Sequence, residues 1–138
     1  MCSGFELWYD IHMQEKELIQ KAKDIIEKRY KKGFHTVGSA LKTKQGKFYT
    51  GICLNSQKVD ICSEWSVLGQ AFSEGDTDIE MIVALKRDED GSFEIFPPCG
   101  LCRELYITYC PQVKVIISEN EIVEAKELLP NAWKKKKN

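Results

Sequence analysis

The stretch IEMIVALK, residues 79–86, is a nearly continuous apolar run of strand length. Such a run is typical of a strand covered on both faces, because a strand with one face in water alternates apolar and polar residues. We therefore expect residues 79–86 to form a central strand with helices packed against both faces of its sheet. The segments on either side should supply those helices and the partner strands.

Helical patterns occur both before and after this strand. Helices are expected at about residues 10–32, 62–74, 99–110 and 124–130. In the first segment the apolar residues recur at helical spacing, with Asp10 as a candidate N-cap. Gly75 closes the second helix, and Pro111 ends the third because proline disfavours helix at the preceding residue.

Four further segments have strand character. They are residues 36–43, 47–54, 92–96 and 113–118. The turn at 44–46 between the first two suggests a hairpin. With 79–86 these segments make five strands, and their order among the helices predicts an α/β fold built on a mixed sheet with helices on both faces.

Composition and charge fit one ordinary globular domain spanning residues 1–138. The chain is 43% hydrophobic and 30% charged, with a formal net charge of −1. A nucleic-acid surface normally shows as a basic excess, so such a partner is not expected. The basic run Lys134–Lys137 is interpreted as part of a flexible tail, 134–138.

Neither a membrane helix nor a secretion signal is evident. No apolar run approaches the roughly 20 residues that a membrane span requires, and the first residues lack a basic segment followed by an apolar one. A cytoplasmic location is therefore expected, where disulfides rarely persist.

The chain nevertheless has six cysteines, at 2, 53, 62, 99, 102 and 110. Those at 2, 53 and 110 are interpreted as structural or incidental.

The other three cysteines have the spacing of a metal site. Cys62 lies at a predicted helix start, and Cys99 and Cys102 lie three residues apart at another, which puts their sulfurs on one face. Three protein ligands with one open position are typical of catalytic zinc. Glu64 would face that open position and transfer protons, and the Arg103 cation would offset the negative charge of the thiolates.

Simpler interpretations exist for each residue. The cysteines could be buried thiols or a redox pair, Glu64 could be a helix-N-terminal acid stabilised by the helix dipole, and Arg103 could form a surface salt bridge. Neither cysteine alternative explains the combination of Cys-x-Glu with Pro-Cys-x-x-Cys.

That combination, CSE at 62–64 with PCGLC at 98–102, resembles the cytidine deaminase family in its small, all-cysteine form. The resemblance runs from about Gly33 to Trp133, and PQVKVII with the ELLP-plus-Trp ending is closest to the blasticidin-S deaminases. It implies a three-layer α/β/α sandwich around a mixed five-stranded sheet. It also implies one Zn²⁺ per chain on Cys62, Cys99 and Cys102, and commonly a homotetramer, with a homodimer as the alternative.

The resemblance further implies hydrolytic deamination of a free cytosine-type nucleoside, either cytidine, deoxycytidine or the antibiotic blasticidin S, with Glu64 as proton shuttle. The backbone around Ser63 and Pro98 would hold the base. Phe34 and Trp133 match positions of aromatic rings near the base, and a neighbouring subunit often lends the C-terminal one.

The resemblance weakens at the sugar. Cytidine deaminases carry an Asn-x-Glu pair that grips the ribose, and Cys53 and Asn55 occupy those positions here. Loss of polar groups that bind a substrate hydroxyl can change the discrimination between substrates by orders of magnitude. A cytosine nucleoside with a different sugar is therefore a candidate substrate. Blasticidin S is such a compound, and its deamination would give antibiotic resistance. The alternative function is a non-catalytic zinc-stabilised domain that binds a nucleoside or a partner.

Overall fold

The computed structural model describes residues 4–136 of the chain. Cys2, Lys137 and Asn138, on which sequence interpretations also fell, lie outside the described residues. The elements in chain order are α1 (Gly4–Arg29), β1 (Val37–Thr43), β2 (Phe48–Ile52), β3 (Leu54–Asn55), β4 (Asp60–Ile61), α2 (Ser63–Ser73), β5 (Ile79–Arg87), β6 (Phe93–Ile95), α3 (Gly100–Tyr109), β7 (Lys114–Ser118), β8 (Glu121–Glu124) and the 3-10 turn η1 (Ala125–Leu128).

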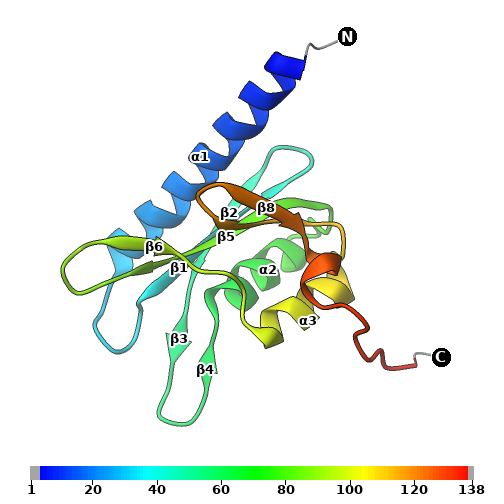
Figure 1. Cartoon of the computed structure of the whole chain (residues 1–138). Coiled ribbons are helices and arrows are strands. Elements are labelled where there is room, and N and C mark those ends of the chain that lie inside the picture. The colour runs from blue at the N-terminus through cyan, green and yellow to red at the C-terminus, as the bar shows by residue number, and fades with distance from the viewer. Residues whose placement is uncertain (1–3, 137–138) are drawn as a thin grey trace.

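β5 is the centre of a mixed sheet whose order is β2-β1-β5-β7-β8 (Figure 1). It runs antiparallel to β1, with Val83 opposite Ala40, and parallel to β7, with Ile82 opposite Val115. The short β6 pairs with the end of β5 and adds a sixth strand among the described residues. Residues 81–85 of β5 are at most 4% exposed, which confirms the prediction of a strand covered on both faces.

Helices cover the two faces of this sheet separately. On one face α1 packs through Leu18 and Ala22 against Met81 and Val83 of β5. On the other face α2 and α3 form a second apolar cluster around Ile82. The mixed sheet between two helical layers, with β5 at its centre, is the predicted three-layer α/β/α sandwich.

Two neighbouring glycines allow the helices to approach the sheet closely. A Cβ on Gly38 of β1 would lie 2.8 Å from the Cβ of Ile26 in α1. A Cβ on Gly51 of β2 would lie 2.9 Å from the backbone nitrogen of Val67 in α2. Gly51 is paired with Ser39, the residue next to Gly38, and adjacent residues of a strand point to opposite faces. The absence of a side chain at these two sites therefore sets the helix–sheet distance on each face.

The structure differs from the sequence expectations at four places. The segment expected as one strand at 47–54 is divided into β2 and β3, and β3 pairs with the unpredicted β4 outside the main sheet. Helix α1 begins at Gly4, so the prediction of Asp10 as N-cap is wrong; Glu6 in the first turn suits the positive end of the helix dipole. The closing segment forms only one 3-10 turn at 125–128. Strand β8 was not predicted, and it pairs antiparallel with β7.

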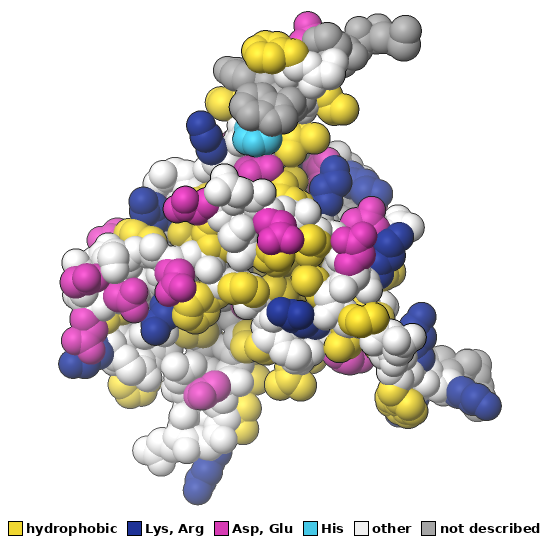
Figure 2. Space-filling model, viewed as in Figure 1, with side chains coloured by type: hydrophobic (Ala, Val, Ile, Leu, Met, Phe, Trp, Pro, Cys, Tyr) yellow, Lys and Arg dark blue, Asp and Glu magenta, His cyan; other side chains and the backbone are white. Residues whose placement is uncertain are grey.

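The surface carries charges of both signs. In Figure 2 the basic side chains are scattered among acidic ones over the visible face and do not form a continuous stripe in the described residues. No helix within residues 4–136 combines the length and the apolar character that a membrane span requires.

Candidate active site

Three cysteine sulfurs meet where α2 and α3 begin. Cys62 is the N-cap of α2 and Cys99 is the N-cap of α3, both with extended backbone, and Cys102 lies in the first turn of α3. The Cys62 and Cys99 sulfurs are 3.6 Å apart, and those of Cys99 and Cys102 are 3.5 Å apart. All three sulfurs lie within 4.8 Å of one another. The structure therefore brings together the three predicted ligands from two separate segments.

This triangle of sulfurs fits a zinc ion. Zn–S bonds of about 2.3 Å in tetrahedral geometry place neighbouring sulfurs about 3.8 Å apart, close to the two separations above. Among the described residues this is the one group of three or more His, Cys, Asp and Glu side chains close enough to hold a metal ion. Three ligands in tetrahedral geometry leave one position open, which is the arrangement of a catalytic site.

The helix starts affect the three thiols differently. Burial opposes ionisation of Cys99, but the backbone N–H groups of Cys102 and Leu101, with the neighbouring thiols, lower the pKa of Cys99 below its ordinary value. Burial and a hydrogen bond with Cys99 raise the pKa of Cys62 to about 11. Burial and the nearby Glu64 charge raise the pKa of Cys102. A metal that binds here must therefore displace protons from the Cys62 and Cys102 thiols, whose pKa values are raised.

Glu64 is buried beside the sulfurs, with 6% of its surface exposed. The Ser63 hydroxyl donates a hydrogen bond to its carboxyl oxygen Oε1 at 3.1 Å, and Ser63 shares a further bond of 2.5 Å with Ser39 of β1. Burial raises the pKa of Glu64 above the ordinary glutamate value. A raised pKa means that this carboxyl group accepts a proton more readily than an exposed glutamate does, which suits a group that takes up and releases protons.

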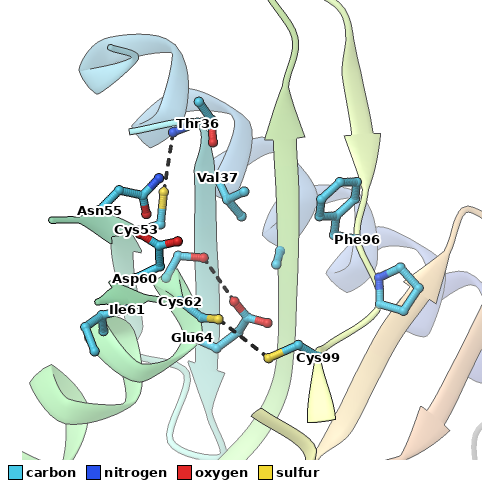
Figure 3. A pocket seen from close by; sticks show the side chains of 13 residues that line it. Thr36, Val37, Cys53, Asn55, Asp60, Ile61, Cys62, Glu64, Phe96 and Cys99 are labelled. Carbon is cyan, nitrogen blue, oxygen red and sulfur yellow. Dashed lines mark hydrogen bonds between the residues drawn. The ribbon is translucent and has the colours of Figure 1, made fainter. Parts of the chain in front are cut away.

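A cavity of about 240 Å³ opens beside these groups (Figure 3). Figure 3 shows the Glu64 carboxyl lying next to the Cys62 and Cys99 sulfurs, with Phe96 on one side and the β3–β4 hairpin on the other. The lining residues are Thr36, Val37, Cys53, Asn55, Asp60, Ile61, Cys62, Ser63, Glu64, Ala84, Phe96, Pro97 and Cys99. A mostly apolar wall with a few convergent polar groups is typical of a small-ligand site.

Cys53 and Asn55 are the predicted sugar-end residues that line the cavity. The Cys53 thiol donates to the Phe34 carbonyl oxygen at 3.6 Å and accepts from the Thr36 backbone N–H at 3.4 Å. The backbone carbonyl oxygen of Cys53 lies 2.9 Å from Nδ1 of His35. These contacts fix the backbone at the end of β2, and the Asn55 side chain follows at the cavity wall.

Phe34, Pro98 and Trp133 are not among the lining residues. The Phe34 ring is half exposed beneath the Lys31 ammonium, 4.6 Å from its centroid. Trp133 is 81% exposed. Pro98 is buried, and its neighbour Pro97 lines the cavity instead. Within one chain the structure does not bring these side chains to the cavity.

Arg103 contacts backbone oxygens. Its Nε donates to the Pro98 carbonyl at 2.8 Å, and its Nη1 donates to the Leu128 carbonyl at 3.1 Å. The guanidinium thereby joins the segment before α3 to η1. Its predicted role as a cation for the thiolates stays a prediction.

Sequence reasoning missed Thr36, Asp60 and Phe96, which line the same cavity. Asp60 had one available signal, since an acid two residues before a metal-motif cysteine lies close to that motif in space. Thr36 and Phe96 reach the cavity only through the pairing of their segments with the sheet.

Two curated relatives align with most of the chain. It is 34% identical over 131 residues to the blasticidin-S deaminase of Bacillus cereus, covering 88% of this chain and 94% of that protein. It is 32% identical over 104 residues to the cytidine deaminase of Halalkalibacterium halodurans, covering 70% and 76% respectively. No family model matches the chain.

Solved structures share the fold. The crystal structure of the cytidine deaminase from Bacillus anthracis superposes with a TM-score of 0.73 at 23% identity, covering 86% of this chain and 89% of that one. The cytidine deaminase from Burkholderia pseudomallei superposes with a TM-score of 0.70 at 26% identity, covering 86% and 98%.

Proposed function

Because the chain belongs to the cytidine deaminase family, we propose that it catalyses zinc-dependent hydrolytic deamination of a free cytosine-type nucleoside. Water replaces the exocyclic amine at carbon 4, giving the uracil form and ammonia. The observation that supports this most directly is a cluster of three thiols beside the buried Glu64 carboxyl group, of which Cys62, Cys99 and Glu64 line a single cavity while Cys102 is buried behind them. No one of these features alone would indicate this reaction.

The proposed roles follow from the geometry of the groups. Cys62, Cys99 and Cys102 would hold the zinc ion, which when bound supplies Lewis-acid activation of water. Glu64 would take one proton from the attacking water and pass it to the ring nitrogen. It would then take the second proton from the new hydroxyl group on carbon 4 and pass it to the amine, which leaves as ammonia as the carbonyl forms. The Ser63 hydrogen bond orients the Glu64 carboxyl group for these transfers. Burial excludes bulk water from the protons in transit.

Two observations bear on which nucleoside is used. The relative with the greater coverage is a blasticidin-S deaminase, and Cys53 and Asn55 stand at the cavity wall where a ribose-gripping pair was expected. We propose that blasticidin S is a substrate and that cytidine and deoxycytidine are deaminated less efficiently.

The exposed aromatic residues support a role for a second copy of the chain. Trp133 is largely exposed and Phe34 half exposed, and neither lines the cavity of its own chain. We propose a homotetramer in which Trp133 of a neighbouring subunit completes the site. Multi-angle light scattering of the wild type and Trp133→Ala would test this, since a monomer with full activity excludes a shared site.

The decisive experiment measures ammonia release by purified protein of known zinc content. Cytidine, deoxycytidine and blasticidin S are supplied in parallel, and the uracil product is followed by its absorbance. Release that scales with zinc content supports the proposed reaction. Bound zinc with no release from any of the three compounds would contradict it and favour a binding function.

A further inference from the structure

The cavity holds a second acidic side chain, and we propose that Asp60 determines which sugar substituents the substrate can carry. Its carboxylate would accept hydrogen bonds from hydroxyl or ammonium groups on the sugar and disfavour phosphate. This inference rests on the proposed function, because it takes the ligand of the cavity to be a cytosine nucleoside.

The β3–β4 hairpin sets the position of Asp60. Asp60 and Asn55 are direct partners across the hairpin, and side chains opposite one another in an antiparallel pair lie on the same face. Both residues line the cavity. Figure 3 shows their polar ends close to Cys53, on the hairpin wall that faces Phe96 across the cavity.

Depth separates the two acids of the cavity. Glu64 lies at the closed end beside the sulfurs and is 6% exposed, whereas Asp60 is exposed at the hairpin. When the amine of the cytosine base reaches Glu64 and the sulfurs, the sugar of the same nucleoside lies toward the open end of the cavity. Asp60 is the acidic side chain among the lining residues that the sugar can meet there.

The Asn55 and Asp60 side chains on the hairpin wall are open to a ligand. Within residues 4–136 the Asp60 carboxylate and the Asn55 side-chain amide make no hydrogen bond or ion pair with another residue. A carboxylate left open toward a cavity can accept charge-assisted hydrogen bonds from a ligand, which are about twice as strong as neutral ones.

The negative charge of the cavity lining favours ligand groups that donate hydrogen bonds or carry positive charge over anionic groups. The charged lining residues are Asp60 and Glu64, both acidic, and neither lysine nor arginine lines the cavity in the described part of the chain. A phosphate would therefore bring negative charge next to Asp60 without a compensating cation. An ammonium at the same place would form an ion pair, and a hydroxyl would form a hydrogen bond.

The test compares four ligands that differ in one sugar substituent: cytidine, 3′-amino-3′-deoxycytidine, 5′-amino-5′-deoxycytidine and cytidine 5′-monophosphate. Dissociation constants are measured by calorimetry on zinc-loaded protein carrying Glu64→Gln, in which the ligands stay intact. Asp60→Asn in this background removes the charge and retains the shape. It should weaken binding of one of the amino nucleosides by about 10- to 100-fold and change cytidine by no more than about threefold.

The same substitution should tighten binding of the monophosphate relative to cytidine. Asp60→Glu should retain the wild-type order of ligands, and Glu119→Gln, which removes an exposed acid outside the lining, should leave all four constants unchanged. High salt should reduce the preference for the amino nucleoside in the parent protein only. Equal zinc content and equal melting temperature establish that the variants are folded.

An equal effect on all four ligands, or an effect on none, would overturn the role of Asp60. Ammonia release from cytidine by the protein with Glu64 intact is measured separately. A charge-dependent binding order without ammonia release contradicts the proposed reaction and leaves the role of Asp60 in ligand selection supported. Ammonia release without the charge-dependent binding order supports the proposed reaction and contradicts the role of Asp60.

Discussion

The two faces of the sheet use helices differently. On the α1 face, Leu18 and Ala22 pack fully buried against apolar strand residues, and Ile26 is fully buried over Gly38 of β1. On the opposite face, α2 and α3 bury Val67 and Leu105 in the same way, but the starts of these helices also bring Cys62, Cys99 and Glu64 to the cavity. The α1 face contributes apolar packing alone. The face covered by α2 and α3 contributes apolar packing and also positions the candidate reactive groups.

The difference lies in where the helices begin. Cys62 and Cys99 have extended backbone at the N-caps of α2 and α3, so their side chains lie beside the backbone N–H groups of the first helical turn. The body of each helix then fixes that turn by apolar packing. The core of the α1 face can therefore be changed without changing the reactive groups, whereas Cys102 belongs both to the sulfur cluster and to the apolar core under α2 and α3.

Glu64→Gln should have the largest effect. It retains the size of a buried side chain and removes the proton carrier, so turnover should fall by about 10³-fold, within the range of general acid–base catalysis. Zinc content and fold should persist because the three thiols are unchanged. Ammonia release and atomic absorption measure the two quantities in parallel, with Glu119→Gln as the matched control. Full activity in the variant would remove Glu64 from the mechanism.

Removal of the metal should affect the cysteine face next. Anything that binds only the folded protein stabilises it, by about 4 kcal/mol at a thousandfold excess over its dissociation constant. A chelator should therefore lower the melting temperature, and added Zn²⁺ should restore it. Cys102→Ser should melt like the chelated protein and respond little to either addition. An unchanged melting temperature after verified zinc removal would contradict a zinc site that supports α2 and α3.

Part of the metal cluster could be predicted from sequence because its geometry is local. Three residues of helix bring the sulfurs of Cys99 and Cys102 to one face. Cys62 lies in a separate segment, and only its own helix start and the resemblance of CSE and PCGLC to a known motif joined it to the other two. The central strand 79–86 was accessible for a local reason, since continuous burial leaves a continuous apolar run.

The rest of the cavity depends on pairing between distant segments. Asp60 reaches the wall through the register of a hairpin only two residues long on each side, which has no apolar pattern to show it. Strand β8 follows a tight turn after β7 and contains two acidic residues at its ends, so its apolar signal is short. The start of α1 at Gly4 was missed because the helical periodicity was traced only from Ile11 onward.

Leu18→Ala tests the α1 face. Leu18 is fully buried against the sheet, and shortening a buried leucine costs about 2–5 kcal/mol through lost transfer energy and the cavity left behind. Denaturant unfolding should show this loss, while zinc content and kcat/KM at low temperature should stay at the level of the parent. A comparable loss of kcat/KM in the folded variant would mean that the two faces are coupled through the sheet.

Gly38→Ala and Gly51→Ala should give the smallest effects and the sharpest comparison. The added methyl group meets Ile26 of α1 in the first variant and the backbone of Val67 in α2 in the second, and overpacking of this kind costs about 1–3 kcal/mol. Unfolding free energies should therefore fall by similar amounts in the two variants. Only Gly51→Ala displaces the helix that carries Cys62 and Glu64, so it alone should lower kcat/KM beyond what its unfolded fraction explains. Equal kcat/KM values, measured on fully folded and zinc-loaded protein, would show that α2 moves along the sheet without moving its first turn.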